Sequence, residues 1–147
     1  LSPHFKPLSK QMQEWMEAPF EQNPKYPENK IHKTSSGNMV GSKSEVLIDM
    51  VLYKNNIPFR YEAELLLGES IFYPDFTIMH PKTEELIYWE HFGIMDDPTY
   101  CKNVFSKLNL YIANGIIPNI NLITTYETKD FPLDTKQIND MINLYLQ

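Results

Sequence analysis

The pattern of apolar and polar positions predicts alternating helices and strands along most of the chain. Apolar residues at helical spacing indicate helices from Ser42 to about Asn55, over 98–114 and over 135–146. β-branched and aromatic clusters indicate strands over 59–67, 71–79, 86–91 and 120–126. The order of helix, three strands, helix, strand and helix predicts an α/β fold, with a mixed sheet that is flanked by helices.

Residues 1–40 give a weaker pattern and are expected to form a helical and loop appendage to a domain over 41–147. A short helix fits 11–20, where Met12, Trp15, Met16 and Phe20 share one face. Pro24 and Pro27 then interrupt the pattern.

Two acidic residues stand inside the apolar hairpin over 70–91. Asp75 lies between two apolar runs, and Glu90 directly follows Leu86-Ile87-Tyr88-Trp89. A four-residue loop over 81–84 would pair Asp75 with Glu90 on one face of the sheet. Two opposed carboxylates repel each other unless a cation lies between them or one keeps its proton, so the pair is a candidate metal site. The alternative is a pair of carboxylates at strand ends that face solvent.

Two further residues have both a chemical and a structural interpretation. Glu45 lies in the first predicted helical turn, where Ser42-Lys43-Ser44-Glu45 matches a capping box. Lys107 lies in the helix over 98–114, beside the expected core face of Cys101, Phe105, Leu108 and Ile112. Its own stripe contains Tyr100, Val104 and Tyr111, and a boundary lysine ordinarily extends its ammonium to water.

Composition and charge narrow the functional classes. No apolar run is long enough to cross a membrane, so no membrane partner is expected. A single cysteine, Cys101, excludes a disulfide within the chain and fits the cytoplasm.

The net charge is −6, but residues 1–60 carry eight basic and six acidic side chains, whereas 61–147 carry five and thirteen. Basic side chains of the first part are therefore candidates to face an anionic ligand. The chain begins with Leu1, so it is also a candidate fragment of a longer protein.

The acids, their order and their spacing resemble the PD-(D/E)xK nuclease superfamily, which has the restriction-endonuclease-like fold. The resemblance covers about residues 42–127 and rests on Ser44-Glu45, on Tyr73-Pro74-Asp75-Phe76 and on Ile87-Tyr88-Trp89-Glu90-His91-Phe92-Gly93. The superfamily's usual lysine stands two residues after the glutamate, where this chain has Phe92. Lys107 on the following helix is our candidate for a displaced catalytic lysine.

The resemblance implies a Mg²⁺- or Mn²⁺-dependent deoxyribonuclease. Asp75, Glu90 and the backbone carbonyl of His91 would hold the ion, and Glu45 would assist. The side chain of His91 should point to the opposite face of the strand from Glu90. Lys107 would activate water or stabilise the transition state. Residues expected to shape the pocket or contact DNA are His32, Lys33, Lys43, Tyr100 and Tyr111.

Two other functional classes stay open. Phe92 at the lysine position fits an inactive nuclease-like fold that acts as a nucleic-acid-binding or interaction module. A glycosidase also uses two carboxylates, one of which keeps its proton, although directly opposed cross-strand neighbours are rather close for that chemistry.

Overall fold

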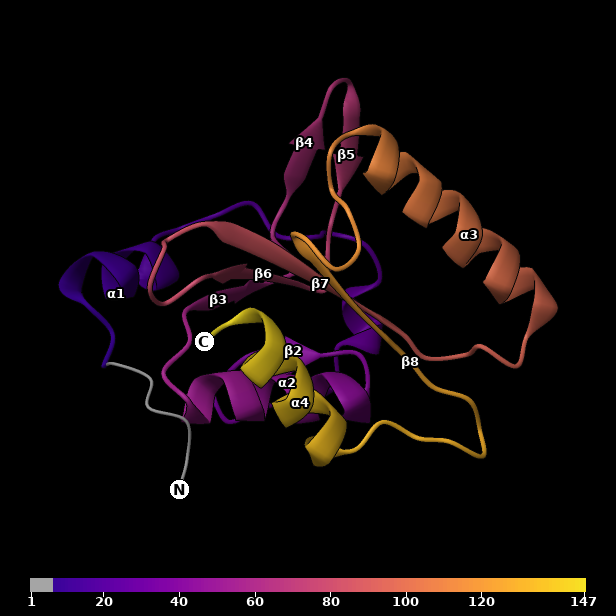
Figure 1. Cartoon of the computed structure of the whole chain (residues 1–147). Coiled ribbons are helices and arrows are strands. Elements are labelled where there is room, and N and C mark those ends of the chain that lie inside the picture. The colour runs from indigo at the N-terminus through magenta and orange to yellow at the C-terminus, as the bar shows by residue number, and fades with distance from the viewer. Residues whose placement is uncertain (1–6) are drawn as a thin grey trace.

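The computed structural model describes residues 7–147 and has a mixed four-stranded sheet at its centre (Figure 1). The strand order is β3-β6-β7-β8, with β3 (Phe59–Tyr61), β6 (Phe76–Met79), β7 (Leu86–Phe92) and β8 (Leu122–Tyr126). The first three strands are antiparallel, whereas β7 and β8 run parallel and are joined through α3 (Pro98–Ala113). The predicted fold class, a mixed sheet flanked by helices, is confirmed.

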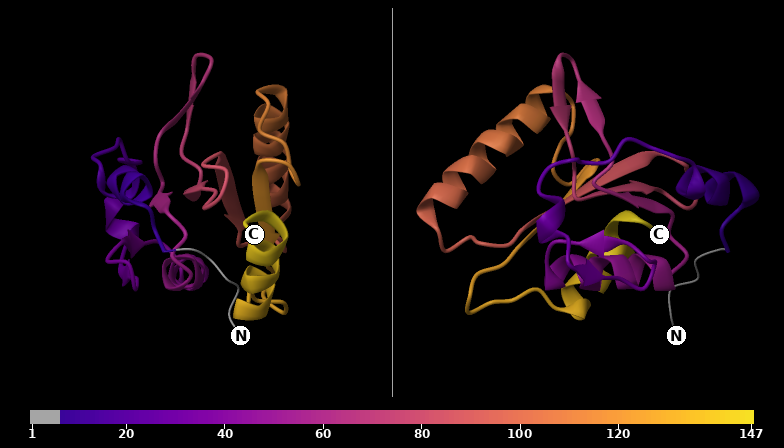
Figure 2. Two further views of the ribbon diagram at one scale, coloured as in Figure 1. Left: turned by 60° about the vertical axis from the view of Figure 1, so that its left-hand side comes forward. Right: turned by 180° about the vertical axis from the view of Figure 1, so that it is seen from behind.

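One face of the sheet packs on α2 (Lys43–Lys54) and α4 (Thr135–Tyr145), which lie side by side in Figures 1 and 2. Alternate residues of β7, Ile87 and Trp89, enter this core together with Ile48 of α2 and Ile142 of α4. The intervening residue Tyr88 belongs to a smaller cluster on the opposite face, beneath α3. Even-numbered residues of β7, including Glu90, therefore face α3.

The predicted strands over 59–67 and 71–79 are each wrong in part, because both are interrupted. Glu62 has a left-handed backbone with φ of 49°, which ends β3 after Tyr61. The chain then forms a separate hairpin of β4 (Leu65–Leu67) and β5 (Ser70–Phe72) around Gly68, whose φ is 63°. This hairpin projects beyond the sheet beside α3 in Figure 1, and Leu65 packs in the cluster beneath that helix.

The core face expected for α3 is also wrong in part, because Leu108 packs against the cluster beneath the helix but two other members of that face are exposed. Phe105 and Ile112 are 69% and 46% exposed, whereas Val104 and Tyr111 are buried. The stripe of Tyr100, Val104, Lys107 and Tyr111 therefore faces the sheet. The Lys107 ammonium and the Tyr111 hydroxyl can lie at the sheet because both contact the carboxylate of Glu90 on β7. The spacing of apolar residues alone does not reveal this pairing.

The segment over 7–40 packs along β3. It contains α1 (Lys10–Glu17), a single 3₁₀ turn (Pro27–Asn29) and a small hairpin of β1 (His32–Lys33) and β2 (Met39–Val40). The predicted helix over 11–20 is therefore shorter and ends at Glu17. Val40 is fully buried in the main core, and Gln22 Nε2 donates to the carbonyl of Tyr61 at 3.0 Å.

Candidate functional site

The hairpin that carries Asp75 and Glu90 has the register that the sequence predicts. Phe76 pairs with Trp89 and Met79 with Leu86, and the amide of His80 donates to the carbonyl of Glu85 at 2.8 Å across the loop over 81–84. Asp75 directly precedes β6 and continues this pairing toward Glu90. Its Oδ2 accepts a hydrogen bond from the amide of His91 at 2.7 Å, which fixes the carboxylate against β7.

Glu90 is 2% exposed and is held from α3. Tyr111 donates its hydroxyl to Glu90 Oε1 at 2.7 Å, and Lys107 Nζ lies 2.9 Å from the same oxygen. Lys107 therefore reaches the acidic pair rather than extending to bulk water. Within residues 7–147, no hydrogen bond engages Glu90 Oε2 or Asp75 Oδ1, so one oxygen of each carboxylate is available to a ligand.

A cavity of about 270 Å³ opens at this point of the sheet. Asp75 and Glu90 line it from the strands, and Tyr100 and Lys107 line it from α3. The Tyr100 hydroxyl accepts a hydrogen bond from the amide of Gly93 at 3.0 Å, which ties the start of α3 to the end of β7. The cavity thus brings two acids and one ammonium group to a common space.

Glu45 of α2 also lies close to Asp75, and so does Glu62, which the sequence pattern does not indicate as a site residue. One carboxylate oxygen from each of Glu45, Glu62 and Asp75 lies within 4.8 Å of the other two. Glu62 is buried, and Lys30 Nζ lies 2.6 Å from its Oε1. The sequence pattern does not indicate Glu62 as a site residue, because it predicts one continuous strand over 59–67 that contains Glu62. Only the left-handed turn after Tyr61 brings it to Asp75.

The structure confirms that Glu45 belongs to the helix cap, though with a partner one residue earlier than predicted, whereas its chemical role stays a prediction. Ser42 is the N-cap of α2, and its Oγ accepts from the amide of Glu45 at 3.2 Å. Glu45 Oε1 reaches back to the amide of Gly41 at 3.1 Å, one residue earlier than the expected Ser42. Its Oε2 accepts instead from the hydroxyl of Tyr61 at 3.2 Å. The helix cap therefore orients a carboxylate toward the site.

The electrostatics of the site are those of crowded, desolvated acids. Burial, together with the charges of Glu90 and Glu45, raises the pKa of Asp75 well above its ordinary value. Burial and the charge of Glu62 likewise raise the pKa of Glu45. Burial lowers the pKa of Lys107, but the charges of Glu90 and Asp75 outweigh that effect and raise it above the usual lysine value. Lys107 therefore remains an ammonium at neutral pH.

This donor set fits a hard divalent cation. Its potential ligands are carboxylate oxygens, which suit Mg²⁺ and Mn²⁺. A cation beside Asp75 would relieve the repulsion that raises the pKa of that carboxyl group. Asp75 and Glu90 each have an oxygen to offer, whereas the predicted role of the His91 carbonyl stays a prediction.

His91 and Phe92, the last two residues of β7, have structural partners. The His91 side chain points away from Glu90, as strand alternation predicts, and its Nδ1 and Nε2 lie 2.8 Å from Thr125 Oγ1 and 2.6 Å from Glu127 Oε1. Ser44 donates its hydroxyl to the same oxygen of Glu127. Phe92 is 3% exposed and stacks on Tyr126, with ring centroids 5.4 Å apart.

The basic residues proposed for DNA contact lie elsewhere. Lys33 and Lys43 are exposed and His32 is half-buried, and none of them lines the cavity beside Asp75. Tyr111 does not line it either, because this fully buried residue acts on the site through Glu90. Contact of these lysines and of His32 with DNA stays a prediction.

Comparisons with protein-family models, curated proteins and solved structures give no match to this chain. Across 7–147, no helix combines the length and apolarity that a membrane crossing requires. Geometry and chemistry are therefore the basis for assigning a function.

Proposed function

We propose that this chain is a metal-dependent nuclease that hydrolyses phosphodiester bonds of DNA. The observation that supports the proposal is the convergence of Glu45, Asp75, Glu90 and Lys107 from α2, the β6–β7 hairpin and α3. These residues stand in the order expected for the PD-(D/E)xK superfamily, with the lysine moved to the helix. Restriction-endonuclease-like is accordingly our proposed assignment of the fold.

Asp75 and Glu90 would hold Mg²⁺ or Mn²⁺ with the oxygens that no protein donor engages. A divalent ion in this position supplies Lewis-acid charge that offsets the negative charge growing on the phosphate. Because the amide of His91 fixes Asp75 and the hydroxyl of Tyr111 fixes Glu90, both carboxylates are oriented before substrate binds.

Glu45 would accept a proton in the reaction, and Lys107 would stabilise negative charge. The raised pKa of Glu45 makes this carboxylate a suitable acceptor for the proton of an attacking water. The raised pKa of Lys107 keeps it charged, so it stabilises negative charge on the phosphate rather than acting as a base. Of the two roles considered for Lys107, the electrostatic one is favoured.

Cleavage of labelled DNA in Mg²⁺ or Mn²⁺ tests the proposal. Wild-type protein is expected to cut the DNA, EDTA to stop the reaction, and Asp75→Asn and Glu90→Gln to abolish it. Glu69→Gln is the matched control, because Glu69 is an exposed acid in the turn between β4 and β5. Equal cleavage by the wild type and by both site variants would identify a contaminating nuclease and overturn the assignment.

The second candidate function is a catalytically inactive module that binds nucleic acid. Buried Phe92 at the usual lysine position favours it, as does the direct pairing of Lys107 with Glu90, which already offsets one of the site's acids. DNA binding without cleavage at any divalent-ion concentration would support this candidate over the enzyme.

A further inference from the structure

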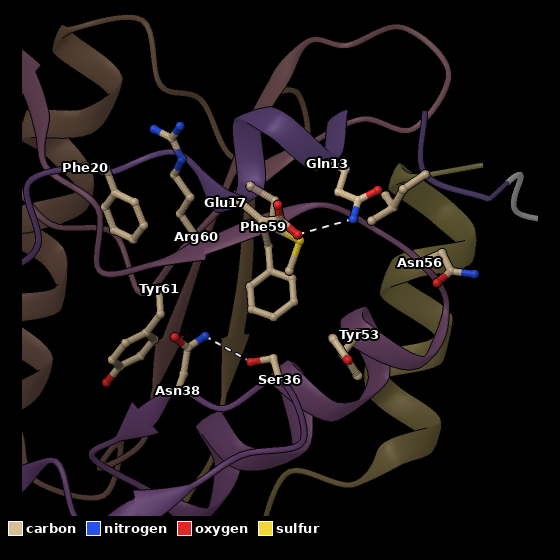
Figure 3. Close-up of a pocket in the computed structure, with 12 residues that line it drawn as sticks. Gln13, Glu17, Phe20, Ser36, Asn38, Tyr53, Asn56, Phe59, Arg60 and Tyr61 are labelled. Carbon is tan, nitrogen blue, oxygen red and sulfur yellow. Dashed lines mark hydrogen bonds between the residues drawn. The ribbon is translucent and has the colours of Figure 1, made fainter. Parts of the chain in front are cut away.

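A second cavity, of about 520 Å³, lies between α1 and the edge strand β3, as Figure 3 shows. We call it the α1–β3 cavity. Its volume falls within the range of small-molecule binding pockets. It is built almost wholly from the first 61 residues, the part of the chain with the basic balance.

The lining of the α1–β3 cavity combines aromatic rings with amides. Phe59 and Tyr61 form a buried floor, each 2% exposed, and Tyr53 stands at the edge with half of its surface exposed. Three amide side chains also line the cavity, Gln13, Asn38 and Asn56, together with the carboxylate of Glu17, to which Gln13 Nε2 donates at 3.2 Å. A nucleobase offers the complementary features, namely a flat π-face for stacking and an edge of hydrogen-bond donors and acceptors.

Arg60 adds a positive charge at the same cavity. Its Nη2 and Nε donate to the carbonyl of Trp15 at 2.7 and 3.2 Å, and its guanidinium lies 4.3 Å from the Trp15 ring centroid. In the part of the chain from 7 to 147, no carboxylate lies within ion-pair distance of Arg60. The guanidinium also lies 5.0 Å from the Phe20 ring centroid, so it packs against two aromatic rings, while its positive charge would still attract a nearby phosphate.

The α1–β3 cavity borders a third cavity that reaches Glu62, a member of the acidic cluster. Asn38 and Tyr61 also line a neighbouring cavity of about 460 Å³, which includes Lys30 and Glu62. Glu62 belongs to the acidic cluster with Asp75, and the hydroxyl of Tyr61 donates to Glu45 at 3.2 Å. Tyr61 thus lines the α1–β3 cavity with its ring and contacts one of the proposed catalytic acids, Glu45, with its hydroxyl.

We propose that the α1–β3 cavity holds an unpaired nucleobase of the strand whose phosphodiester lies at Asp75, so that the substrate is single-stranded at that nucleotide. The inference rests on the proposed function and extends it to a substrate class. A base inside a duplex is stacked and paired, and it can enter a cavity between α1 and β3 only after leaving the helix. Lys30 and Arg60 are the cations along the path that would contact the backbone phosphates.

Equilibrium binding of a fluorescent oligonucleotide tests the inference without requiring cleavage. With EDTA present, wild-type protein is expected to bind a single strand at least tenfold more tightly than a duplex of the same sequence. Tyr53→Ala should weaken binding of the single strand by about 5- to 150-fold, the range for loss of one base–aromatic stack. Phe131→Ala is the control, because Phe131 is 77% exposed and does not line the cavity.

A second variant addresses the charge. Arg60→Met is expected to reduce the slope of log affinity for the single strand against log salt concentration by about 0.7, as for one lost phosphate contact. Circular dichroism would verify that each variant is folded. Equal affinity for the single strand and the duplex, or an unchanged affinity in Tyr53→Ala, would overturn the inference.

The outcomes also separate this inference from the nuclease proposal. Asp75-dependent cleavage with no effect of Tyr53→Ala on binding would retain the nuclease and reject the nucleobase cavity. Tyr53-dependent binding of the single strand without cleavage would retain the cavity and reject the enzyme.

Discussion

Lys107 Nζ lies 2.9 Å from Glu90 Oε1, so a helix supplies the cation that is absent two residues after Glu90. Replacing this ammonium with an uncharged side chain should slow DNA cleavage by about 10²- to 10³-fold, the usual effect of losing one preorganised charge donor. The variant to measure is Lys107→Met in a single-turnover assay. Lys102→Met, at an exposed position of the same helix, should cleave like wild type. A wild-type rate in Lys107→Met would exclude Lys107 from the reaction.

Asp75→Asn is expected to stabilise the metal-free protein while it abolishes cleavage. Burial and two nearby carboxylates raise the pKa of Asp75, so its ionised form opposes folding, and the neutral amide should raise the free energy of unfolding at pH 7 by on the order of 1 kcal/mol. The amide oxygen can still accept from the amide of His91. Urea unfolding in EDTA measures the effect.

The pH dependence of this effect has a defined sign. A carboxyl group with a raised folded pKa contributes most to stability below its unfolded pKa, about 3.9, and this contribution is lost as the pH rises through the folded pKa. The advantage of Asp75→Asn should therefore grow between pH 4 and pH 7. Asp130→Asn, at an exposed position, should be neutral throughout. A pH-independent difference would show that charge is not the cause.

Tyr111→Phe should destabilise the protein by about 1.5–3 kcal/mol, the range for a hydrogen bond to a charged group. The fully buried ring keeps its packing, while Glu90 Oε1 loses the hydroxyl donor at 2.7 Å. Thermal or urea unfolding measures this cost. Tyr88→Phe is the matched control, since the Tyr88 hydroxyl makes no hydrogen bond to the part of the chain between 7 and 147. Equal effects of the two substitutions would contradict the assigned role of the hydroxyl.

Asp49→Ala should cost about 2–4 kcal/mol and weaken binding of a single DNA strand. Fully buried Asp49 accepts from the Ser36 hydroxyl at 2.7 Å and from the Asn38 amide group at 3.1 Å, which holds the loop over 34–38 against α2. Its removal leaves these donors without an acceptor. Faster hydrogen exchange at Asn38 would report the loosened loop, and exposed Asp140→Ala serves as the control.

The hairpin register and the helix starts were predictable because local chemistry determines them. The loop over 81–84 sets the pairing of β6 with β7, and Ser42 and Asp97 accept backbone amides as N-caps of α2 and α3. These short-range rules were sufficient to place Asp75 opposite Glu90.

Glu62 and the orientation of α3 could not be predicted in the same way. A left-handed φ at a glutamate has no reliable local signal, so the end of β3 and the approach of Glu62 to Asp75 depend on the tertiary structure. On α3, apolar periodicity favoured Phe105 and Ile112 over Lys107 and Tyr111. The face of α3 with Lys107 and Tyr111 turns toward the sheet because it contacts the buried carboxylate of Glu90, which is distant in the sequence.

Tyr61 contacts both proposed binding sites, the one for an oligonucleotide and the one for a divalent ion. Its ring lines the α1–β3 cavity, while its hydroxyl holds Glu45 in the acidic cluster. If a bound divalent ion increases the affinity of the protein for an oligonucleotide, the bound oligonucleotide must increase the affinity for that ion by the same factor. Mg²⁺ affinities measured with and without a single strand would therefore report the same coupling free energy as strand affinities measured with and without Mg²⁺.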